Sequence, residues 1–386
     1  MKEKKIPTSV GIACMWFTLQ CGGGFATGKQ YAVYYSTYGW LALITPFLTW
    51  AVVGIALYFI FEYCRVTRVK SYKDYAQSVF IKKISFVFVL LFDIWAIVTQ
   101  IIGEVSILSG AGALFEELSL NYWLGVLAAS IIVLMIVVSG AKTIMTLSTY
   151  LTVGLVICIV IIGTIGTAQN WQQLCKVVAE RQTGGMTLGQ AVKDSLVYAG
   201  VLVGSMFALC GPSGSLENQK ASVGAAVGGA AINALMLQIL GVAMISNFPE
   251  INTQALPVLS VLHGLQLPVF ESIYKVMLFF ALTSTGTTCA YAIVTRFKPV
   301  CTKYFSCGDR LSSVIIASAL LLVGAFGSKF GLEAAISTGY GYLSKLAWPL
   351  GVLPAVIILP IRLHYLKKKH TAAHASAGEK LVTEGN

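Results

Sequence analysis

Charged residues are scarce in this 386-residue chain. Only 11% of its residues are Asp, Glu, Lys or Arg, whereas a soluble domain carries about a quarter. Apolar residues make up 56% and come in long blocks, and a bilayer-spanning helix needs about 20 predominantly apolar residues. The composition therefore excludes a single soluble domain, a disordered chain and a collagen-like fibre. It indicates a multi-pass protein embedded in the lipid bilayer.

Metal-ligand and disulfide patterns are also missing. The nine cysteines include no C-x-x-C pair, and the four histidines lie in one loop or at the C-terminal end without metal-ligand spacing. We therefore expect no cofactor apart from a coupling ion and no enzymatic activity. The net charge of +11 is distributed between the apolar blocks and forms no basic stripe, so we expect no nucleic-acid partner.

The apolar blocks predict an all-α fold with ten membrane spans. Between them, near 72–80 and 256–262, helical apolar spacing predicts two surface helices. The spans are 7–34, 40–62, 84–112, 121–140, 142–167, 190–216, 222–247, 268–295, 311–328 and 335–364.

The distribution of basic residues predicts the orientation. With the N-terminus inside, 20 of the 27 Lys and Arg residues lie in the cytoplasm, and about seven lie outside or within the spans. This asymmetry follows the positive-inside rule. Both termini are therefore expected to be cytoplasmic.

The second half of the chain resembles the first in layout. Spans six to ten begin about 180 to 195 residues after spans one to five. An odd number of spans per half inverts the second copy, as in many secondary transporters. We expect a first repeat at 1–167, a second at 168–366 and a flexible cytoplasmic tail at 367–386.

The first span contains three consecutive glycines in Gln20-Cys-Gly-Gly-Gly-Phe-Ala-Thr-Gly28, and each weakens a helix by about 1 kcal/mol relative to alanine. Either the helix unwinds there around a cavity, or Gly24-x-x-x-Gly28 is a packing face. The sixth span contains Tyr198-Ala-Gly-Val-Leu-Val-Gly204 and Cys210-Gly-Pro-Ser-Gly214. Paired interruptions at corresponding positions favour a transport site.

An unwound first span predicts how a solute is held. Exposed N–H groups at a half-helix N-terminus attract a carboxylate, and Val201 and Leu202 offer apolar surface to the rest of the solute. The predicted partner is a small organic solute, an amino acid or similar carboxylate. The expected contacts are Gly22, Gly23, Gly24, Thr27 and Gln100, with Gly200, Val201 and Leu202 on the opposite wall.

Three charged residues are candidates for a proton site or a gate. Asp93 and Glu104 share one face of span three with Gln100, and ionisable groups at this depth usually face the bundle interior. Asp93 is a proton acceptor, a cation partner or a structural ion pair. Lys29 either meets an anionic solute from outside or extends to the membrane interface.

Hydroxyl groups are concentrated in span eight, in Ala281-Leu-Thr-Ser-Thr-Gly-Thr-Thr288. Two interpretations are open. The hydroxyls bond back to carbonyls one turn earlier, or they supply hard oxygen ligands to a small cation.

The string Gly22-Gly-Gly-Phe-Ala-Thr-Gly28-Lys-Gln30 resembles the first-span motif of the YkvI-like bacterial membrane proteins. The similarity continues through 109–117, Tyr122-Trp123, 198–214 and 339–342. That family looks like a branch of the amino acid–polyamine–organocation superfamily, whose members have the LeuT fold of two inverted five-helix repeats with broken first and sixth helices. The resemblance implies a protein of the bacterial inner (plasma) membrane.

The resemblance also implies a sodium site. Sodium-coupled members of the LeuT-fold group carry Ala-x-x-Ser/Thr-Ser/Thr on the eighth helix, matched here by Ala281, Ser284 and Thr285, with first-helix carbonyls expected at Thr18 and Cys21. Proton-coupled relatives place a lysine in mid span five, and 146–163 contains none. The implied function is a sodium-coupled symporter working by alternating access, as a monomer or homo-oligomer. A proton-coupled permease and a transporter-like sensor are the alternatives.

The chain departs from the family pattern at two positions. The polar Ser-Tyr-Asn of span six is replaced by Gly200-Val201-Leu202, and the Gln-Glu after the glycine motif is replaced by Lys29-Gln30. A less polar solute is therefore expected on that side of the site.

Overall fold

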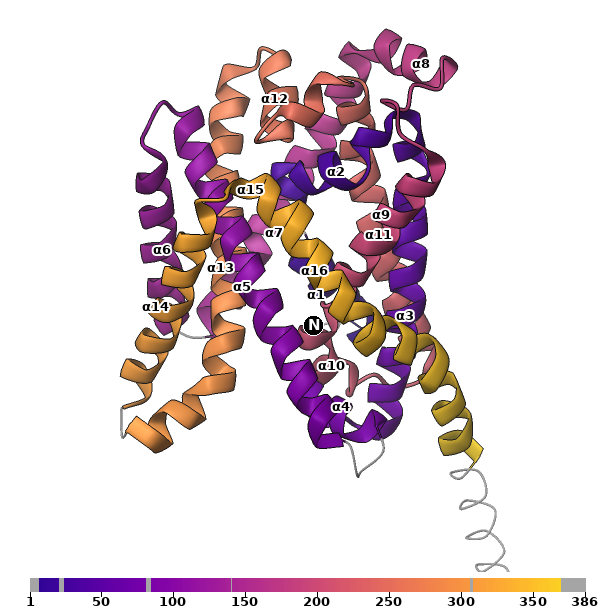
Figure 1. Cartoon of the computed structure of the whole chain (residues 1–386), viewed down its shortest axis with the longest axis vertical. Coiled ribbons are helices and arrows are strands. Elements are labelled where there is room, and N and C mark those ends of the chain that lie inside the picture. The colour runs from indigo at the N-terminus through magenta and orange to yellow at the C-terminus, as the bar shows by residue number, and fades with distance from the viewer. Residues whose placement is uncertain (1–6, 21–23, 81–84, 140, 306–307, 369–386) are drawn as a thin grey trace, which may run out of the picture.

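The computed structural model describes residues 7–20, 24–80, 85–139, 141–305 and 308–368, and almost all of them are helical (Figure 1). In the first half, the helices are α1 (Thr8–Gln20), α2 (Lys29–Tyr34), η2 (Ser36–Leu43), α3 (Thr45–Thr67), α4 (Tyr72–Val79), α5 (Ser85–Glu117), α6 (Tyr122–Ser139) and α7 (Ala141–Gln169).

The second half begins with α8 (Trp171–Ala179), α9 (Leu188–Val203), α10 (Met206–Ser213), α11 (Gln219–Ile245), η3 (Glu250–Thr253) and α12 (Pro257–Gly264). It continues with α13 (Pro268–Phe305), α14 (Asp309–Ser328), α15 (Gly331–Ala334), η4 (Ala335–Gly339), α16 (Tyr340–Ala347), η5 (Trp348–Val352) and η6 (Pro354–Ile358). The last five elements form one continuous helical stretch, from Gly331 to Lys368.

Within the described residues, seven helical stretches are long and apolar enough to cross a bilayer, and two bent helix pairs raise the number to nine. α7 and α8 meet at 74°, and α9 and α10 meet at 50°. α1 and α2 flank the glycine cluster of the remaining predicted span. The predicted all-helical, multi-pass architecture is confirmed, and the helices are compatible with ten spans.

Local sequence signals explain where several helices begin. The Ser71 hydroxyl accepts a hydrogen bond from the Asp74 amide (3.2 Å) and so caps α4. Thr187 and Gln190 form a capping box at the start of α9. The two predicted surface helices are present as α4 and α12. α8 is a further short helix that the apolar blocks did not predict.

The first helix of each half is interrupted, as expected. α1 ends at Gln20, the last described residue before the gap at 21–23. Residues 24–27 are helical, and Gly28, in a left-handed conformation (φ 76°), separates them from α2. In the second half the break lies at Gly204 and Ser205, at the end of the predicted glycine-containing segment 198–204. Gly200 lies within α9, where its missing side chain allows close packing against α16. A Cβ at this position would lie 2.7 Å from the Ser344 hydroxyl.

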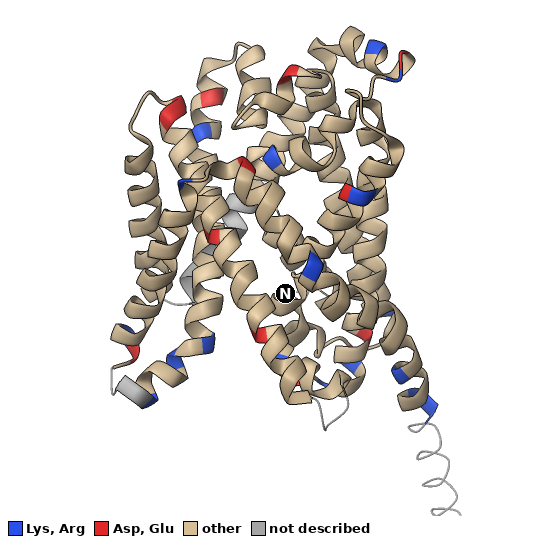
Figure 2. Cartoon of the chain, viewed as in Figure 1, with Lys and Arg blue, Asp and Glu red and all other residues tan. Residues whose placement is uncertain are grey.

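The two ends of the bundle are distinguished by short helices. α8 and α12 lie at one end, and α4 lies at the other (Figure 1). We name these the α12 end and the α4 end. Lys and Arg residues gather toward the α4 end and along the final helix (Figure 2).

Candidate functional site

A cavity of about 480 Å³ lies at the centre of the bundle, beside the break between α9 and α10. Residues of α1, α4, α5 and α13 complete its wall. It extends from Gln30 and Tyr340 to the exposed Lys70 near the α4 end. We call this space the central cavity.

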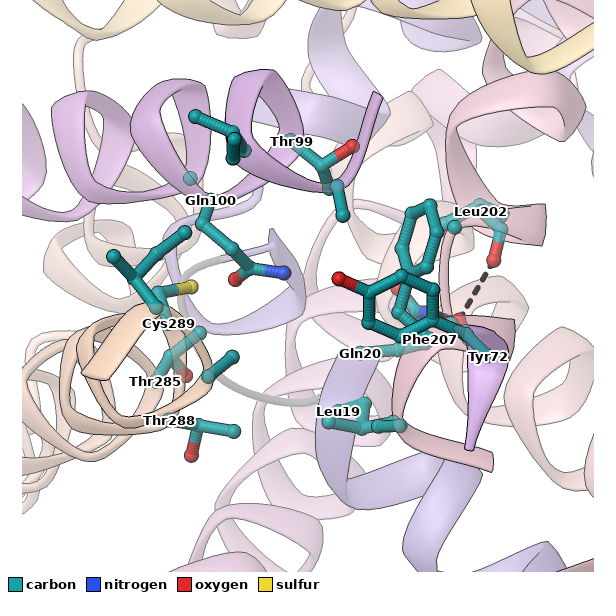
Figure 3. Close-up of a pocket in the computed structure, with 18 of the residues that line it drawn as sticks. Leu19, Gln20, Tyr72, Thr99, Gln100, Leu202, Phe207, Thr285, Thr288 and Cys289 are labelled. Carbon is teal, nitrogen blue, oxygen red and sulfur yellow. Dashed lines mark hydrogen bonds between the residues drawn. The ribbon is translucent and has the colours of Figure 1, made fainter. Parts of the chain in front are cut away.

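The wall of the central cavity combines polar and apolar side chains (Figure 3). The Gln100 amide points into it from the same side as Thr285, Thr288 and Cys289 of α13, and Tyr72, Phe207 and Leu202 lie across from them. Apolar surface is contributed by Leu19, Ile97, Val201, Leu202 and Phe207. A solute with one polar and one apolar end fits such a wall.

The two broken helices touch across the cavity. The Gln20 side-chain amide, at the end of α1, donates to the Ser205 hydroxyl (2.7 Å), and that hydroxyl donates to the Leu202 carbonyl (2.6 Å; Figure 3). The break in α9–α10 is therefore fixed to the end of α1 by a side-chain hydrogen bond.

A layer of buried side chains closes the cavity toward the α12 end. The Gln30 amide donates to the Tyr340 hydroxyl (2.7 Å), and the Tyr198 hydroxyl donates to the Gln30 carbonyl oxygen. Tyr198 stacks between Tyr34 and Tyr340, at ring distances of 4.8 and 6.5 Å. We call these four residues the closing layer. It joins α2, α9 and α16.

The absence of a side chain at Gly24 leaves space for the Gln30 amide of the closing layer. A Cβ at this position would lie 2.4 Å from the Gln30 side-chain oxygen, so a larger residue would displace the amide from its two tyrosine partners. The glycine that was predicted to expose backbone to a solute thus also accommodates the closing layer.

Lys29 lies beyond the closing layer and ties three elements together. Its side chain is 2% exposed and donates to the backbone carbonyls of Gln254 (2.9 Å) and Asn252 (3.3 Å). The ammonium also pairs with the Glu333 carboxylate at 3.0 Å. Lys29 therefore joins α2 to the η3 segment and to α15, and it does not extend to solvent.

The open end of the cavity is basic. Lys70 and Arg296 line it there, and Arg296 forms a two-pronged ion pair with Asp93. Tyr72 donates to the same carboxylate (2.8 Å), and burial together with this hydrogen bond raises the pKa of Tyr72 to about 12. The Tyr72 hydroxyl is therefore protonated at neutral pH, and Asp93 has two donors.

The predicted solute contacts fall into three groups. Gln100, Val201 and Leu202 line the cavity. Gly200 faces the last helix, and Thr27 is fully buried beside Lys29, whose amide donates to its hydroxyl (3.3 Å). Gly22 and Gly23 lie outside the described residues.

The predicted sodium ligands lie beside the same cavity. Thr18, Ser284 and Thr285 line it. The Thr285 hydroxyl donates to the Ala281 carbonyl at 3.0 Å. This contact is the hydrogen bond to the preceding helical turn that was one of the two interpretations of the hydroxyl cluster. An oxygen that donates its proton to a carbonyl keeps lone pairs for a cation. Cys21 lies outside the described residues.

Glu104 is separate from the cavity wall. It is 0% exposed, and within the described part of the chain neither carboxylate oxygen has a hydrogen-bond partner. Glu104, Gln100 and Asp93 were predicted to share one face of span three, and their surroundings differ because successive levels of α5 meet different helices.

Sequence reasoning missed several residues of the site. Gln20, Tyr72, Phe207 and Arg296 line the cavity, and Tyr340 closes it. The glycine motif directed attention to backbone groups and away from the flanking glutamine. Tyr72 and Arg296 belong to segments that the sequence assigned to a surface helix and to a loop, so only packing brings them to the cavity.

No family model and no curated protein sequence matches the chain. Solved structures do match. The inward-facing conformation of Mhp1 matches with a TM-score of 0.64 at 14% identity, covering 90% of this chain and 75% of that one. A Na⁺-coupled sialic acid symporter in a substrate-bound outward-open state gives 0.63 at 12% identity, with coverages of 92% and 79%. MhsT in complex with L-phenylalanine gives 0.59 at 14% identity, with coverages of 92% and 97%.

These likenesses confirm the predicted LeuT-like fold. The narrower resemblance to the YkvI-like proteins stays a prediction.

Proposed function

We propose that the chain is a secondary active transporter of a small organic solute, working by alternating access. The observation that carries the proposal is the central cavity, which lies between the broken helices, is open toward the α4 end and is closed toward the α12 end. A transport cycle needs such a one-sided site. That the neighbours are described as symporters and transporters supports transport over catalysis.

We assign the α4 end to the cytoplasm. The basic residues that the positive-inside rule places inside gather at this end (Figure 2). The structure then corresponds to the inward-facing state, with both termini cytoplasmic. By the same assignment, the closing layer and Lys29 form the outer gate.

Opening the outer gate requires specific contacts to break. α2, α9 and α16 separate only if the Gln30–Tyr340 and Tyr198–Gln30 hydrogen bonds are lost together with the contacts of Lys29. These contacts connect elements from both halves of the chain. We propose that the halves, 1–167 and 168–366, move against each other around the cavity.

The proposed solute is an amino acid or a similar small carboxylate with an apolar portion. Lys70 and Arg296 attract an anion at the mouth, and Gln100 offers an amide that both donates and accepts. Val201, Leu202 and Phe207 suit an apolar side chain. The complex of MhsT with L-phenylalanine is consistent with this class of solute.

We propose sodium as the coupling ion, bound by the hydroxyls of Ser284 and Thr285 and by carbonyls of Thr18, Cys21 and Ala281. Hydroxyl and carbonyl oxygens are ligands that a hard cation prefers. The position of Thr18, Ser284 and Thr285 on the cavity wall supports this site, because an ion there would exchange with the cytoplasm. The sodium coupling of the sialic acid symporter supports the choice of ion.

Uptake into proteoliposomes tests the function. The purified chain is reconstituted and supplied with a mixture of radiolabelled uncharged L-amino acids, with and without an inward sodium gradient. We expect sodium-dependent accumulation by the native chain and a strong reduction in Gln100→Ala. Equal counts in protein-containing and empty vesicles, for this mixture and for a panel of other small carboxylates, would refute the proposed solute class.

A further inference from the structure

Glu104 is a carboxyl group built into an apolar site. It lies on α5 and is fully buried, and its two oxygens have no hydrogen-bond partner among the described residues. The neighbouring side chains Ile107, Leu108 and Val133 are apolar. An ionised carboxylate left in such surroundings without a partner is energetically very costly.

Two glycines make the space for this carboxyl group. A Cβ on Gly286 of α13 would lie 3.0 Å from a Glu104 carboxylate oxygen, and a Cβ on Gly324 of α14 would lie 3.0 Å from Glu104 Cγ. Even an alanine at either position would crowd the side chain. The glycines of α13 and α14 thus leave space for the Glu104 side chain, although neither oxygen has a hydrogen-bond partner among the residues that the structure describes.

A metal site does not explain Glu104. The described part of the chain contains no group of three His, Cys, Asp or Glu side chains that could hold a metal ion. A cation needs several oxygen ligands, whereas the described residues around Glu104 offer glycines, aliphatic side chains and the thiol of Cys289. The ligand that suits an isolated, buried carboxylate is a proton, because it removes the charge.

The carboxyl group lies one layer behind the central cavity. Gly103 and Cys289 both line the cavity, and the Cys289 sulfur lies 3.1 Å from the position of a Cβ on Gly103. Gln100, one turn earlier on α5, also lines it. The contact between Gly103 and Cys289 therefore separates Glu104 from the water-accessible space, and separation of α5 from α13 would expose the carboxyl group.

We propose that Glu104 is a proton-binding site coupled to the conformational cycle. In the inward-facing conformation the carboxyl group is sealed and carries a proton. When α5 and α13 separate, its O–H bond breaks, the proton passes to water in the cavity and the carboxylate is solvated. This inference rests on the proposed function only for the transport step, because proton binding is a property of the structure itself.

Few other titratable groups face Glu104. The thiol of Cys289 on α13 lies close enough to interact with it electrostatically. Gly286 of α13 and Gly324 of α14 face the side chain, and the other described side chains beside these glycines, Ile107, Leu108 and Val133, do not titrate. On α5 itself, Asp93 lies three turns away and is paired with Arg296. A proton signal from this site can therefore be assigned to Glu104.

Infrared spectroscopy of the purified full-length chain in nanodiscs at neutral pH tests the protonation. A protonated carboxylic acid has a carbonyl stretching band distinct from that of a carboxylate. We expect this band in the native chain, its loss in Glu104→Gln and its persistence in the control Asp93→Asn. A native spectrum without the band, or an unchanged band in Glu104→Gln, would overturn the proposal.

Isotope labelling keeps the test independent of folding in the variant. If Glu104→Gln does not fold, the native chain is prepared with ¹³C-labelled glutamate or with ¹³C-labelled aspartate. The band should shift only with labelled glutamate. A band that shifts only with labelled aspartate would rule out Glu104 as the proton site.

Proteoliposomes test the coupling. At a fixed sodium gradient, an inward proton gradient of one pH unit should raise accumulation of the labelled amino-acid mixture by up to about tenfold if one proton accompanies each solute. Glu104→Gln should transport without this dependence. The coupling would be refuted if accumulation by the native chain did not depend on the proton gradient. It would also be refuted if accumulation by Glu104→Gln depended on the gradient as strongly as in the native chain. If no solute is transported by the native chain, the proposed function fails, whereas the infrared band still decides proton binding.

Discussion

Lys29 should set the stability of the outer gate. Its ammonium group is held by two backbone carbonyls, of Asn252 and Gln254, and by the Glu333 carboxylate. The informative perturbation is Lys29→Met, which keeps the length and the apolar stem of the side chain and removes the donor. Glu333→Gln removes only the ion pair and serves as its partner variant.

The structure gives different magnitudes for the two variants. Glu333 is 69% exposed, so its ion pair contributes at most about 1 kcal/mol because water screens it. The Lys29 side chain that donates to the two carbonyls is buried. A hydrogen bond to a charged group contributes about 1.5 to 3 kcal/mol. We therefore expect Lys29→Met to weaken the closed gate by about 3 kcal/mol, or about a hundredfold in the opening equilibrium. Glu333→Gln should change it by about fivefold at most.

Hydrogen exchange measured by mass spectrometry in nanodiscs is the assay, because it reports the free energy of local opening. Backbone amides of α2 and η3 should exchange about a hundredfold faster in Lys29→Met, while those of α6 remain unchanged. Lys329→Gln is the matched control, since Lys329 is exposed and, among the side-chain interactions of the described residues, its ammonium lies only over the rings of Trp123 and Phe326.

Two results would refute the reasoning about Lys29. Unchanged exchange of α2 and η3 in a folded Lys29→Met variant would show that the ammonium does not hold the gate. An effect of Glu333→Gln as large as that of Lys29→Met would show that the exposed ion pair, and not the carbonyl contacts, carries the energy.

Three further predictions concern the cavity and the α4 end. Gln100→Ala should raise the KM for the transported solute by about fivefold, since one hydrogen bond contributes about 1 kcal/mol, and an unchanged KM in uptake assays would exclude a solute contact. Replacing Ser284 and Thr285 together by alanine should raise the half-saturating sodium concentration steeply without altering the fold, and an unaltered sodium curve would remove the proposed ion site. Glu62 is buried and accepts from Arg65, Ser222 and Lys367, so Glu62→Gln should destabilise the chain by about 3 kcal/mol in a thermal unfolding assay. The Lys367 side chain is 42% exposed, so Lys367→Gln should lower the free energy of unfolding by about 1 kcal/mol or less. Equal losses of stability in the two variants would contradict this account.

Much of the fold could be predicted because the bilayer imposes simple rules on sequence. Long apolar blocks must be helices, since backbone polar groups have no water to bond. The predicted 121–140 block is α6 at Tyr122–Ser139, and the segment near 72–80 is α4 at Tyr72–Val79. The glycine-rich motif that ends at Gly28 indicated the first interruption, because glycine weakens a helix and adopts the left-handed conformation found at Gly28.

Positions that depend on contacts between helices were harder to predict. The predicted segment 198–204 contains both Gly200 and Gly204, and the break lies at Gly204 and Ser205. Gly200 remains within α9 and packs against Ser344 and Trp348. A sequence shows that a residue is glycine but not whether that glycine bends its own helix or makes room for another. Only the neighbouring helix decides between these roles.

The amino-acid sequence by itself determined that this chain is a multi-pass helical protein, with interruptions in the first helix of each half and polar groups at Gln100, Ser284 and Thr285. Tertiary structure decided which groups meet. It placed Lys29 against Asn252 and Gln254, about 225 residues away, and it left Glu104 unpartnered among the described residues. The physical reason is that hydrophobicity and helix propensity act locally along the chain, whereas the environment of a charge is set by whichever distant segments pack around it.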